Sequence, residues 1–222
     1  MPRVVVIENT LGCKGGDIFP LQQMNNVFAY AKDIGAYRYL DGARILHASI
    51  ASGIDVTSYT DSADLLSMCL SKGLGAPIGS IMVGTQELIL RAKKYRKWFG
   101  GDLHQAGMMA AAGLYAMQNH VERLAEDHEH AALLHQLLND MDEAPARYKG
   151  TNMVTLDIAA LGIPPVHFAG FLRQKGVGGL PYNAREMRFM PHLNISRDDI
   201  YKAAGIIKDT VHVLSHARET IK

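Results

Sequence analysis

The chain has 222 residues, of which 48% are hydrophobic and 20% are charged, and its formal net charge is +1. This composition is typical of a globular protein with a substantial core, and it excludes extended disorder. Because basic and acidic residues nearly balance, we expect neither nucleic acid nor an anionic membrane as a partner. No apolar run approaches the ~20 residues of a membrane-spanning helix. The two cysteines have no motif spacing, which favours a reduced, cytoplasmic protein.

The beginning of the chain alternates apolar strands with an amphipathic helix. Residues 4–7 and 37–40 are predicted strands, and residues 20–34 between them have the apolar spacing of a helix. This order predicts a βαβ unit, and ligands bind where the parallel strands of such units end. Asp41 follows the second strand directly. We therefore expect the Asp41 carboxylate at a ligand-binding edge of a sheet.

The middle of the chain is predicted to hold two more strands and several helices. These are a short helix (43–51), irregular sequence to residue 62, strands at 64–70 and 78–83, and helices at 85–98, from about 103, and at 121–138. The connection between the two strands is too short for a parallel crossover, so we expect them to be antiparallel. Thr85 is expected to cap the helix that follows it. The next helix is predicted to bury a stripe of Leu103, Ala106, Gly107, Ala110, Leu114 and Met117.

A charged, proline-containing segment at residues 140–150 is the best candidate for a domain boundary. We accordingly expect a large domain at 1–140 and a small α+β domain at 141–222. The small domain is predicted to contain a strand (152–157), a helix (165–175), short strands (177–180 and 188–191) and a terminal helix (198–222) capped by Ser196.

The most informative motif is a single lysine, Lys72, in a glycine-rich turn after an apolar strand. An ordinary surface lysine is one interpretation. The apolar and small neighbours instead predict a buried turn, where desolvation would lower the pKa of the amine and make it a nucleophile. A phosphate-binding loop is excluded because the lysine precedes its glycines.

Lys72 and Asp41 together are the pair that a pyridoxal phosphate (PLP) enzyme needs. The lysine forms the Schiff base, and the carboxylate keeps the pyridine nitrogen protonated. Alternatively, Asp41 caps the helix predicted at residue 43. Arg44 and Arg188 are candidates for gripping a substrate carboxylate, although an exposed strand arginine explains Arg188 equally well. We expect no metal site, because the histidines of the helix at 121–138 lack a shared-face spacing.

Residues 39–45 (Tyr-Leu-Asp-Gly-Ala-Arg-Ile) and 67–80 (Ser-Met-Cys-Leu-Ser-Lys-Gly-Leu-Gly-Ala-Pro-Ile-Gly-Ser) resemble the low-specificity threonine aldolase family of the β-eliminating lyases. The likeness continues through nearly the whole chain. It implies an α/β fold of the aspartate aminotransferase-like type (fold type I), with a mostly parallel sheet domain and a smaller C-terminal α+β domain. It also implies PLP as cofactor, Lys72 as the Schiff-base lysine, and Asp41 as the partner of the pyridine nitrogen. Arg44 and Arg188 would bind the substrate α-carboxylate, and Arg44 would lie against the cofactor.

The activity that this resemblance implies is cleavage of L-threonine, L-allo-threonine or related β-hydroxy-α-amino acids to glycine and an aldehyde, by a homodimer or homotetramer. That would place the chain in threonine catabolism and glycine biosynthesis. Three departures accompany the likeness. The chain begins at a strand inside the usual cofactor domain, so we expect the N-terminal part of that domain to be lacking. Leu11 replaces a usual histidine, and Asp102 and His104 interrupt a usual glycine-rich run.

Two alternatives follow from these departures. The chain could be a catalytically impaired homologue that acts as a structural or assembly partner. It could also be a PLP enzyme redirected to racemisation or β-elimination.

Overall fold

The structure is a computed structural model that describes residues 1–220, and the chain divides into two compact units. The first unit contains residues 1–12 and 17–125, and the second contains residues 13–16 and the chain from residue 126. The predicted joint at residues 140 and 141 therefore lies inside the second unit. The division comes earlier because helix α6 (Leu124–Leu138) buries Ala131, Leu134 and Leu138 in the core of the second unit.

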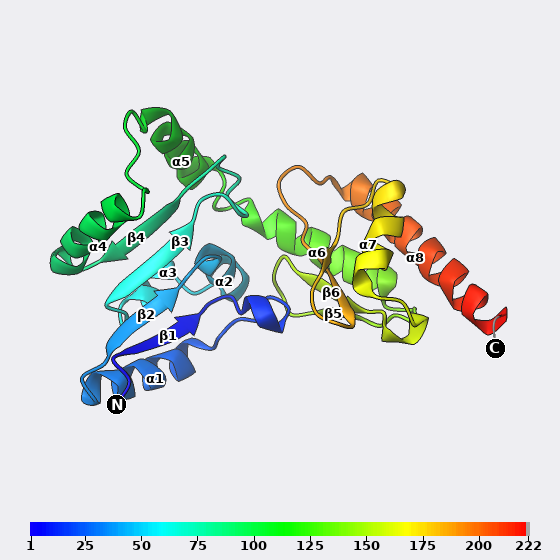
Figure 1. The fold of residues 1–222 in the computed structure, drawn as a ribbon, viewed down its shortest axis with the longest axis horizontal. Coiled ribbons are helices and arrows are strands. Elements are labelled where there is room, and N and C mark those ends of the chain that lie inside the picture. Colours follow the sequence, from blue (N-terminus) through cyan, green and yellow to red (C-terminus); the bar gives the residue numbers. More distant parts are fainter. Residues whose placement is uncertain (221–222) are drawn as a thin grey trace. The chain divides into compact units, whose positions relative to one another are not determined.

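The first unit is built on a four-stranded sheet with the order β1-β2-β3-β4 (Figure 1). Its strands are β1 (Val4–Glu8), β2 (Tyr37–Asp41), β3 (Leu65–Cys69) and β4 (Ser80–Gly84). The first three strands are parallel, and β4 is antiparallel to β3, which confirms the expected antiparallel pair. The predicted βαβ unit is formed by β1, α1 (Leu21–Asp33) and β2.

One face of this sheet is covered by α1 together with α2 (Ile45–Ser52) and α3 (Val56–Thr60). Phe28 of α1 and Leu40 of β2 are fully buried in the core between them. Because side chains alternate along a strand, the residues on either side of Leu40 belong to the opposite face.

The opposite face of the sheet is exposed among the described residues. We call it the bare sheet face, and its apolar side chains include Val4, Val6, Tyr37 and Met82, which are 49%, 58%, 50% and 44% exposed. Beside it runs α4 (Gln86–Trp98), and the two line a groove of about 730 Å³.

Helix α3 lies where the sequence indicated irregular structure. Its N-cap is Asp55, whose side chain accepts a hydrogen bond from the backbone N–H of Thr57 at 2.8 Å. The helix has only five residues, which is too short for an apolar repeat to reveal it.

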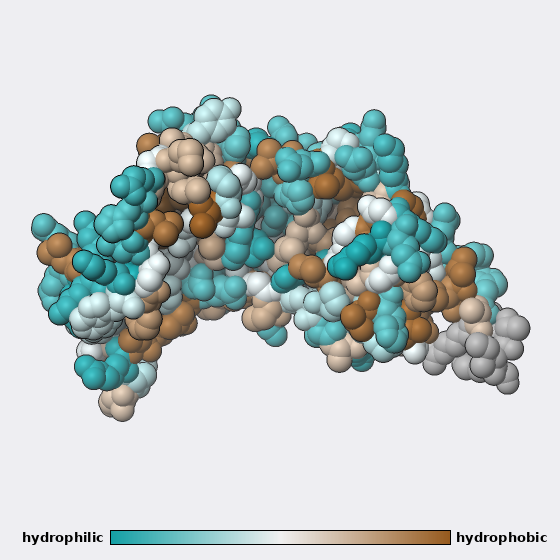
Figure 2. Space-filling model, turned by 45° about the horizontal axis from the view of Figure 1, so that its top comes forward, coloured by the Kyte–Doolittle hydropathy of each residue, from teal (hydrophilic) through white to brown (hydrophobic). Residues whose placement is uncertain are grey.

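The helices after the sheet fit the predictions only in part. Thr85 caps α4 as expected, because its hydroxyl accepts from Leu88 N at 3.4 Å. The stripe predicted for α5 (Gly107–Asn119) is wrong, since Leu103 and Leu114 are both 62% exposed. The buried side of α5 consists of small residues that approach the core closely. A Cβ on Gly113 would lie 3.0 Å from Leu70 Cδ1. Figure 2 shows hydrophobic residues at the surface among hydrophilic ones.

The second unit contains an antiparallel sheet with the order β5-β6-β8-β7. Its strands are β5 (Ala146–Tyr148), β6 (Val154–Asp157), β7 (Leu180–Pro181) and β8 (Glu186–Phe189), and its helices besides α6 are α7 (Pro165–Gln174) and α8 (Arg197–Thr220). Strand β5 was not predicted, and β8 begins two residues earlier than expected. Ser196 caps α8, because its hydroxyl accepts from Asp199 N at 3.2 Å. The last two residues of the predicted terminal helix lie outside the described residues.

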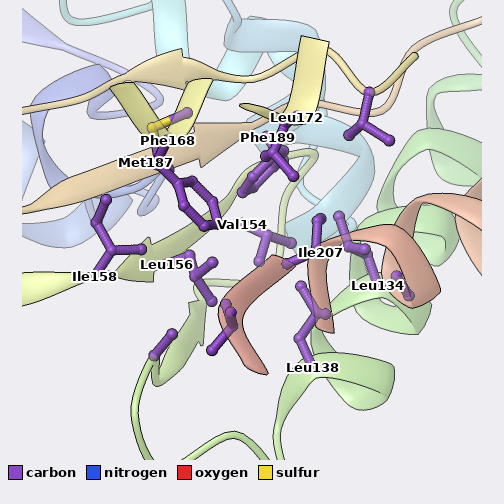
Figure 3. Close-up of a cluster of buried hydrophobic side chains, with 14 of the residues drawn as sticks. Leu134, Leu138, Val154, Leu156, Ile158, Phe168, Leu172, Met187, Phe189 and Ile207 are labelled. Atoms are coloured by element: carbon purple, nitrogen blue, oxygen red, sulfur yellow. The ribbon is translucent and has the colours of Figure 1, made fainter. Parts of the chain in front are cut away.

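The core of the second unit lies between one face of its sheet and the three helices (Figure 3). It includes Val154, Leu156, Phe168, Leu172, Met187, Phe189 and Ile207. None of the helices within residues 1–220 is both long enough and apolar enough to cross a membrane.

Phe168 and Phe171 of α7 offer a matched test of this core, because Phe168 is fully buried and Phe171 is 42% exposed. We expect Phe168→Ala to lower the free energy of unfolding by about 3–5 kcal/mol, through lost burial and the cavity left behind. Phe171→Ala should cost less than about 1 kcal/mol. Urea unfolding followed by circular dichroism measures both changes. Equal losses for the two variants would contradict the placement of α7.

His128 of α6 makes the stability of the fold depend on pH. Burial lowers the pKa of its imidazole to about 4, from an ordinary value of 6.5. Between these values the unfolded chain binds a proton that the folded chain does not, so the free energy of unfolding should fall by about 1–3 kcal/mol as pH falls through this window. Urea unfolding at pH 7 and pH 4.5 should show a shallower pH dependence for His128→Gln than for the wild type. An unchanged dependence would show that His128 titrates normally.

Candidate functional site

The parallel strands of the first unit end at one edge of the sheet. Glu8, Asp41 and Ser67 are direct neighbours in the register of β1, β2 and β3. The lysine turn leaves the same edge, since Lys72 follows the last residue of β3 by three positions. The structure therefore brings Asp41 and the lysine turn to the carboxyl ends of adjacent strands, where α/β proteins bind ligands.

Asp41 is held firmly at the end of β2. Its backbone carbonyl accepts from Asn9 N at 2.9 Å, and its side-chain Oδ1 accepts from Ala43 N at 3.2 Å. Next to it, the Tyr39 hydroxyl donates to Ser67 Oγ at 2.6 Å. Helix α2 begins at Ile45 with Arg44 as its N-cap, so the bond to Ala43 is a local turn before the helix. No other hydrogen bond or ion pair of this carboxylate is found within residues 1–220, which leaves acceptor capacity for a ligand.

The turn that carries Lys72 is closed by backbone hydrogen bonds. Ala76 N donates to Leu70 O at 3.0 Å, and Gly75 N donates to Lys72 O at 2.9 Å. Gly73 and Leu74 are buried as predicted, but Lys72 itself is exposed. The expectation of a desolvated amine is therefore wrong. The turn packs inward through its backbone and small side chains, and the long lysine side chain leaves it toward solvent.

Two histidines that the sequence did not single out support the lysine turn. His47 of α2 is buried, and a Cβ on Gly73 would lie only 2.1 Å from its Nε2. His120 follows α5, and its Nδ1 lies 2.6 Å from Leu74 O. Because a carbonyl oxygen only accepts, His120 Nδ1 carries the proton. No sequence motif predicts these contacts, because they join residues that are distant in the sequence.

Arg44 lies beside the lysine turn. It is half-buried, and it lines a void of about 10 Å³ together with Cys69 and Gly73. The structure thus places Arg44 next to the turn that carries Lys72. This is consistent with its predicted role, which remains a prediction.

Arg188 belongs to the second unit, on β8. It lies directly opposite Thr155 in the sheet, and its Cζ is 5.4 Å from the centre of the Tyr182 ring. Lys72 and Asp41 belong to the first unit, and the joint action of Arg188 with them remains a prediction.

Two of the residues that depart from the family pattern make contacts within the first unit. Leu11 forms an isolated bridge with Asp17, and Asp102 pairs with Arg96.

The chain is similar to a known protein family and to several curated proteins. The family model described as beta-eliminating lyase matches residues 1–161. Low-specificity L-threonine aldolase 1 of Arabidopsis thaliana is 35% identical over 221 residues, which cover 98% of this chain and 62% of the relative. Low specificity L-threonine aldolase of Escherichia coli (strain K12) is 33% identical over 208 residues, with coverages of 91% and 59%. The chain spans about six tenths of the length of these curated relatives.

Solved structures show the same fold. A threonine aldolase of Leishmania major superposes with a TM-score of 0.73 at 17% identity, covering 95% of this chain and 62% of that one. The ornithine aminotransferase of Toxoplasma gondii, whose structure reveals partial occupancy of PLP, superposes with a TM-score of 0.69 at 16% identity, with coverages of 97% and 52%. At such low identities the superpositions show the fold alone. They confirm the predicted fold class.

The contact of Gly73 with His47 is testable by substitution. We expect Gly73→Ala to lower the free energy of unfolding by about 1–3 kcal/mol, because the new methyl group overlaps the imidazole. Gly170→Ala in α7 is the control, since a Cβ there meets nothing within 4 Å. A double-mutant cycle with His47→Ala, measured by urea unfolding, isolates the contact. Strictly additive effects would contradict it.

Proposed function

Because the chain belongs to the beta-eliminating lyase family, we propose that it is a PLP-dependent aldehyde-lyase of the threonine aldolase type. The proposed substrates are L-threonine, L-allo-threonine or related β-hydroxy-α-amino acids. In this reaction the bond between Cα and Cβ breaks. The β-hydroxyl loses its proton to give the aldehyde, and Cα takes up a proton to give glycine. The low-specificity threonine aldolases of Arabidopsis thaliana and Escherichia coli support this choice of substrate.

The observation that carries the proposal is the shared position of Asp41 and the lysine turn at the carboxyl ends of β2 and β3. The donor set fits PLP. Asp41 keeps an acceptor oxygen available, and the Lys72 amine has no hydrogen bond or ion pair with the residues that the structure describes. An anionic acceptor and an accessible amine are the two groups that this cofactor requires from its protein.

The proposed roles of the residues follow from their chemistry. PLP, when bound, supplies an electron sink for the bond that breaks at Cα. Lys72 would hold the cofactor through Nζ, and Asp41 would form a charge-assisted hydrogen bond that keeps the ring nitrogen protonated. Arg44 and Arg188 would bind the substrate α-carboxylate, because a guanidinium matches a carboxylate with two parallel hydrogen bonds. Fixing the carboxylate orients the scissile bond and so contributes to the rate.

Assembly and location belong to the same proposal. Several large apolar side chains around α4 and α5 are exposed, among them Phe99 at 86% and Met108 at 80%. Burial of such a surface in a homodimer or homotetramer would stabilise the chain. Both cysteines, Cys13 and Cys69, are free, which fits the reducing cytoplasm.

The first experiment tests the cofactor. Purified protein mixed with PLP should show a visible absorption band that disappears on borohydride reduction, and peptide mass spectrometry should locate the reduced adduct on Lys72. Lys72→Ala should abolish the adduct, whereas Lys93→Ala, at an exposed lysine of α4, should retain it. Absence of an adduct in the wild-type protein would contradict the assignment of PLP as the cofactor.

The second experiment tests the reaction. Wild-type protein should release glycine and acetaldehyde from L-threonine or L-allo-threonine, and Lys72→Ala should lower kcat/KM on the order of 10³-fold or more. Bound PLP without turnover would favour the assembly-partner alternative. Phenylserine and alanine as further substrates distinguish aldol cleavage from racemisation or β-elimination.

A further inference from the structure

The antiparallel sheet of the second unit has two different faces. Met187 and Phe189 of β8 are buried in the core, so Arg188 between them lies on the other face. Thr155 is its direct neighbour on β6. The same face carries Glu186, which pairs with Arg147 at 2.7 Å. Arg188 is therefore part of a polar surface on this side of the sheet.

Tyr182 lies against Arg188 on this polar face. It sits in the turn between β7 and β8, where its backbone N–H donates to Glu186 O at 2.8 Å. The centre of its ring is 5.4 Å from Arg188 Cζ, which is within the range of a cation–π interaction. Arg188 Nε is buried and makes no hydrogen bond with any residue that the structure describes. The ring of Tyr182 is thus a contact that restricts the guanidinium without occupying its donors.

The other end of Tyr182 is fixed by the loop of residues 13–16. Its hydroxyl oxygen accepts from Gly15 N at 3.0 Å. Burial raises the pKa of Tyr182, so the phenol stays protonated at neutral pH. The loop is anchored in turn, because the Thr151 hydroxyl donates to Gly16 O at 2.7 Å. A Cβ on Gly15 would lie 3.7 Å from Thr155 Cγ2, so loop, tyrosine and arginine share one face of the sheet.

We propose that Tyr182 is a positioning residue, whose ring holds the Arg188 guanidinium and whose hydroxyl ties that pair to the loop of residues 13–16. The inference rests on the proposed function in one respect, namely that Arg188 binds the substrate carboxylate. A guanidinium held in place by a ring loses less conformational freedom when it grips a carboxylate, so it binds that carboxylate more tightly. Without the ring, the guanidinium can still form both hydrogen bonds once the substrate is bound, so the orientation of the scissile bond is kept. Tyr182 would therefore act on substrate affinity and leave the bond-breaking step unchanged.

Steady-state kinetics test this role. Tyr182→Leu removes ring and hydroxyl, and it should raise KM for L-threonine about three- to tenfold while kcat stays within about twofold. Tyr182→Phe keeps the ring and should recover most of the affinity. Tyr201→Leu, at an exposed tyrosine of α8, should change neither constant. A fall in kcat at constant KM for Tyr182→Leu, or wild-type constants, would overturn the proposal.

A chemical readout separates this inference from the proposed function. Phenylglyoxal modifies accessible guanidinium groups, and peptide mass spectrometry follows Arg188 alone. In the purified chain without substrate, Tyr182→Leu should increase the modification rate of Arg188 several-fold and leave that of the exposed Arg185 unchanged. Glycine, used as a carboxylate probe, should protect Arg188 in the wild type and in Tyr182→Phe, and less well in Tyr182→Leu. Equal rates in all variants would overturn the role of Tyr182, even if the chain cleaves no amino acid.

If Tyr182→Leu changes the modification rate of Arg188 but Arg188→Lys leaves KM unaltered, Arg188 does not bind the substrate carboxylate. That outcome overturns the proposal as stated, because Tyr182 then holds an arginine that does not bind substrate. It does not affect the assignment of Lys72 as the PLP-binding lysine, which the borohydride-reduced adduct tests separately.

Discussion

The parallel register of β1, β2 and β3 is the constraint on which the rest of the candidate site depends. It sets Glu8 and Asp41, the last residues of β1 and β2, in one row with Ser67 of β3. Because strand side chains alternate between faces, a slip of one residue would exchange Asp41 with the buried Leu40. The slip would put a carboxylate in the apolar core under α1 and α2, which costs several kcal/mol. The packing of those helices therefore maintains the position of the acidic group.

Local features of the sequence were sufficient for much of the fold. The alternation of apolar runs with an amphipathic helix predicted the βαβ unit, and a short connection predicted the antiparallel pair of β3 and β4. Thr85 and Ser196 were recognised as caps from residue type and position alone. These predictions succeeded because each depends on a few consecutive residues and on one short-range physical rule. The positions of Asp41 and the lysine turn followed from the same rules.

The remaining features depend on contacts between residues that are distant in the chain. The stripe predicted for α5 assumed that large apolar residues turn inward, whereas Gly113 allows an approach to Leu70 that a larger side chain would prevent. The exposure of Lys72 was missed because burial of a turn does not bury its longest side chain. Tyr182 and Gly15 are separated by 167 positions, and no local pattern could have paired them. Side-chain partners of this kind become visible only in the folded chain.

The bare sheet face has a consequence for how the isolated chain behaves in solution. Withdrawing the apolar surface of Val4, Val6, Tyr37 and Met82 from water lowers the free energy by about 25 cal/mol for each Å². Sulfate and phosphate enlarge that gain because they are excluded from protein surfaces. Self-association of this chain should therefore begin at a lower concentration of ammonium sulfate than the nearly neutral net charge of the chain alone would indicate.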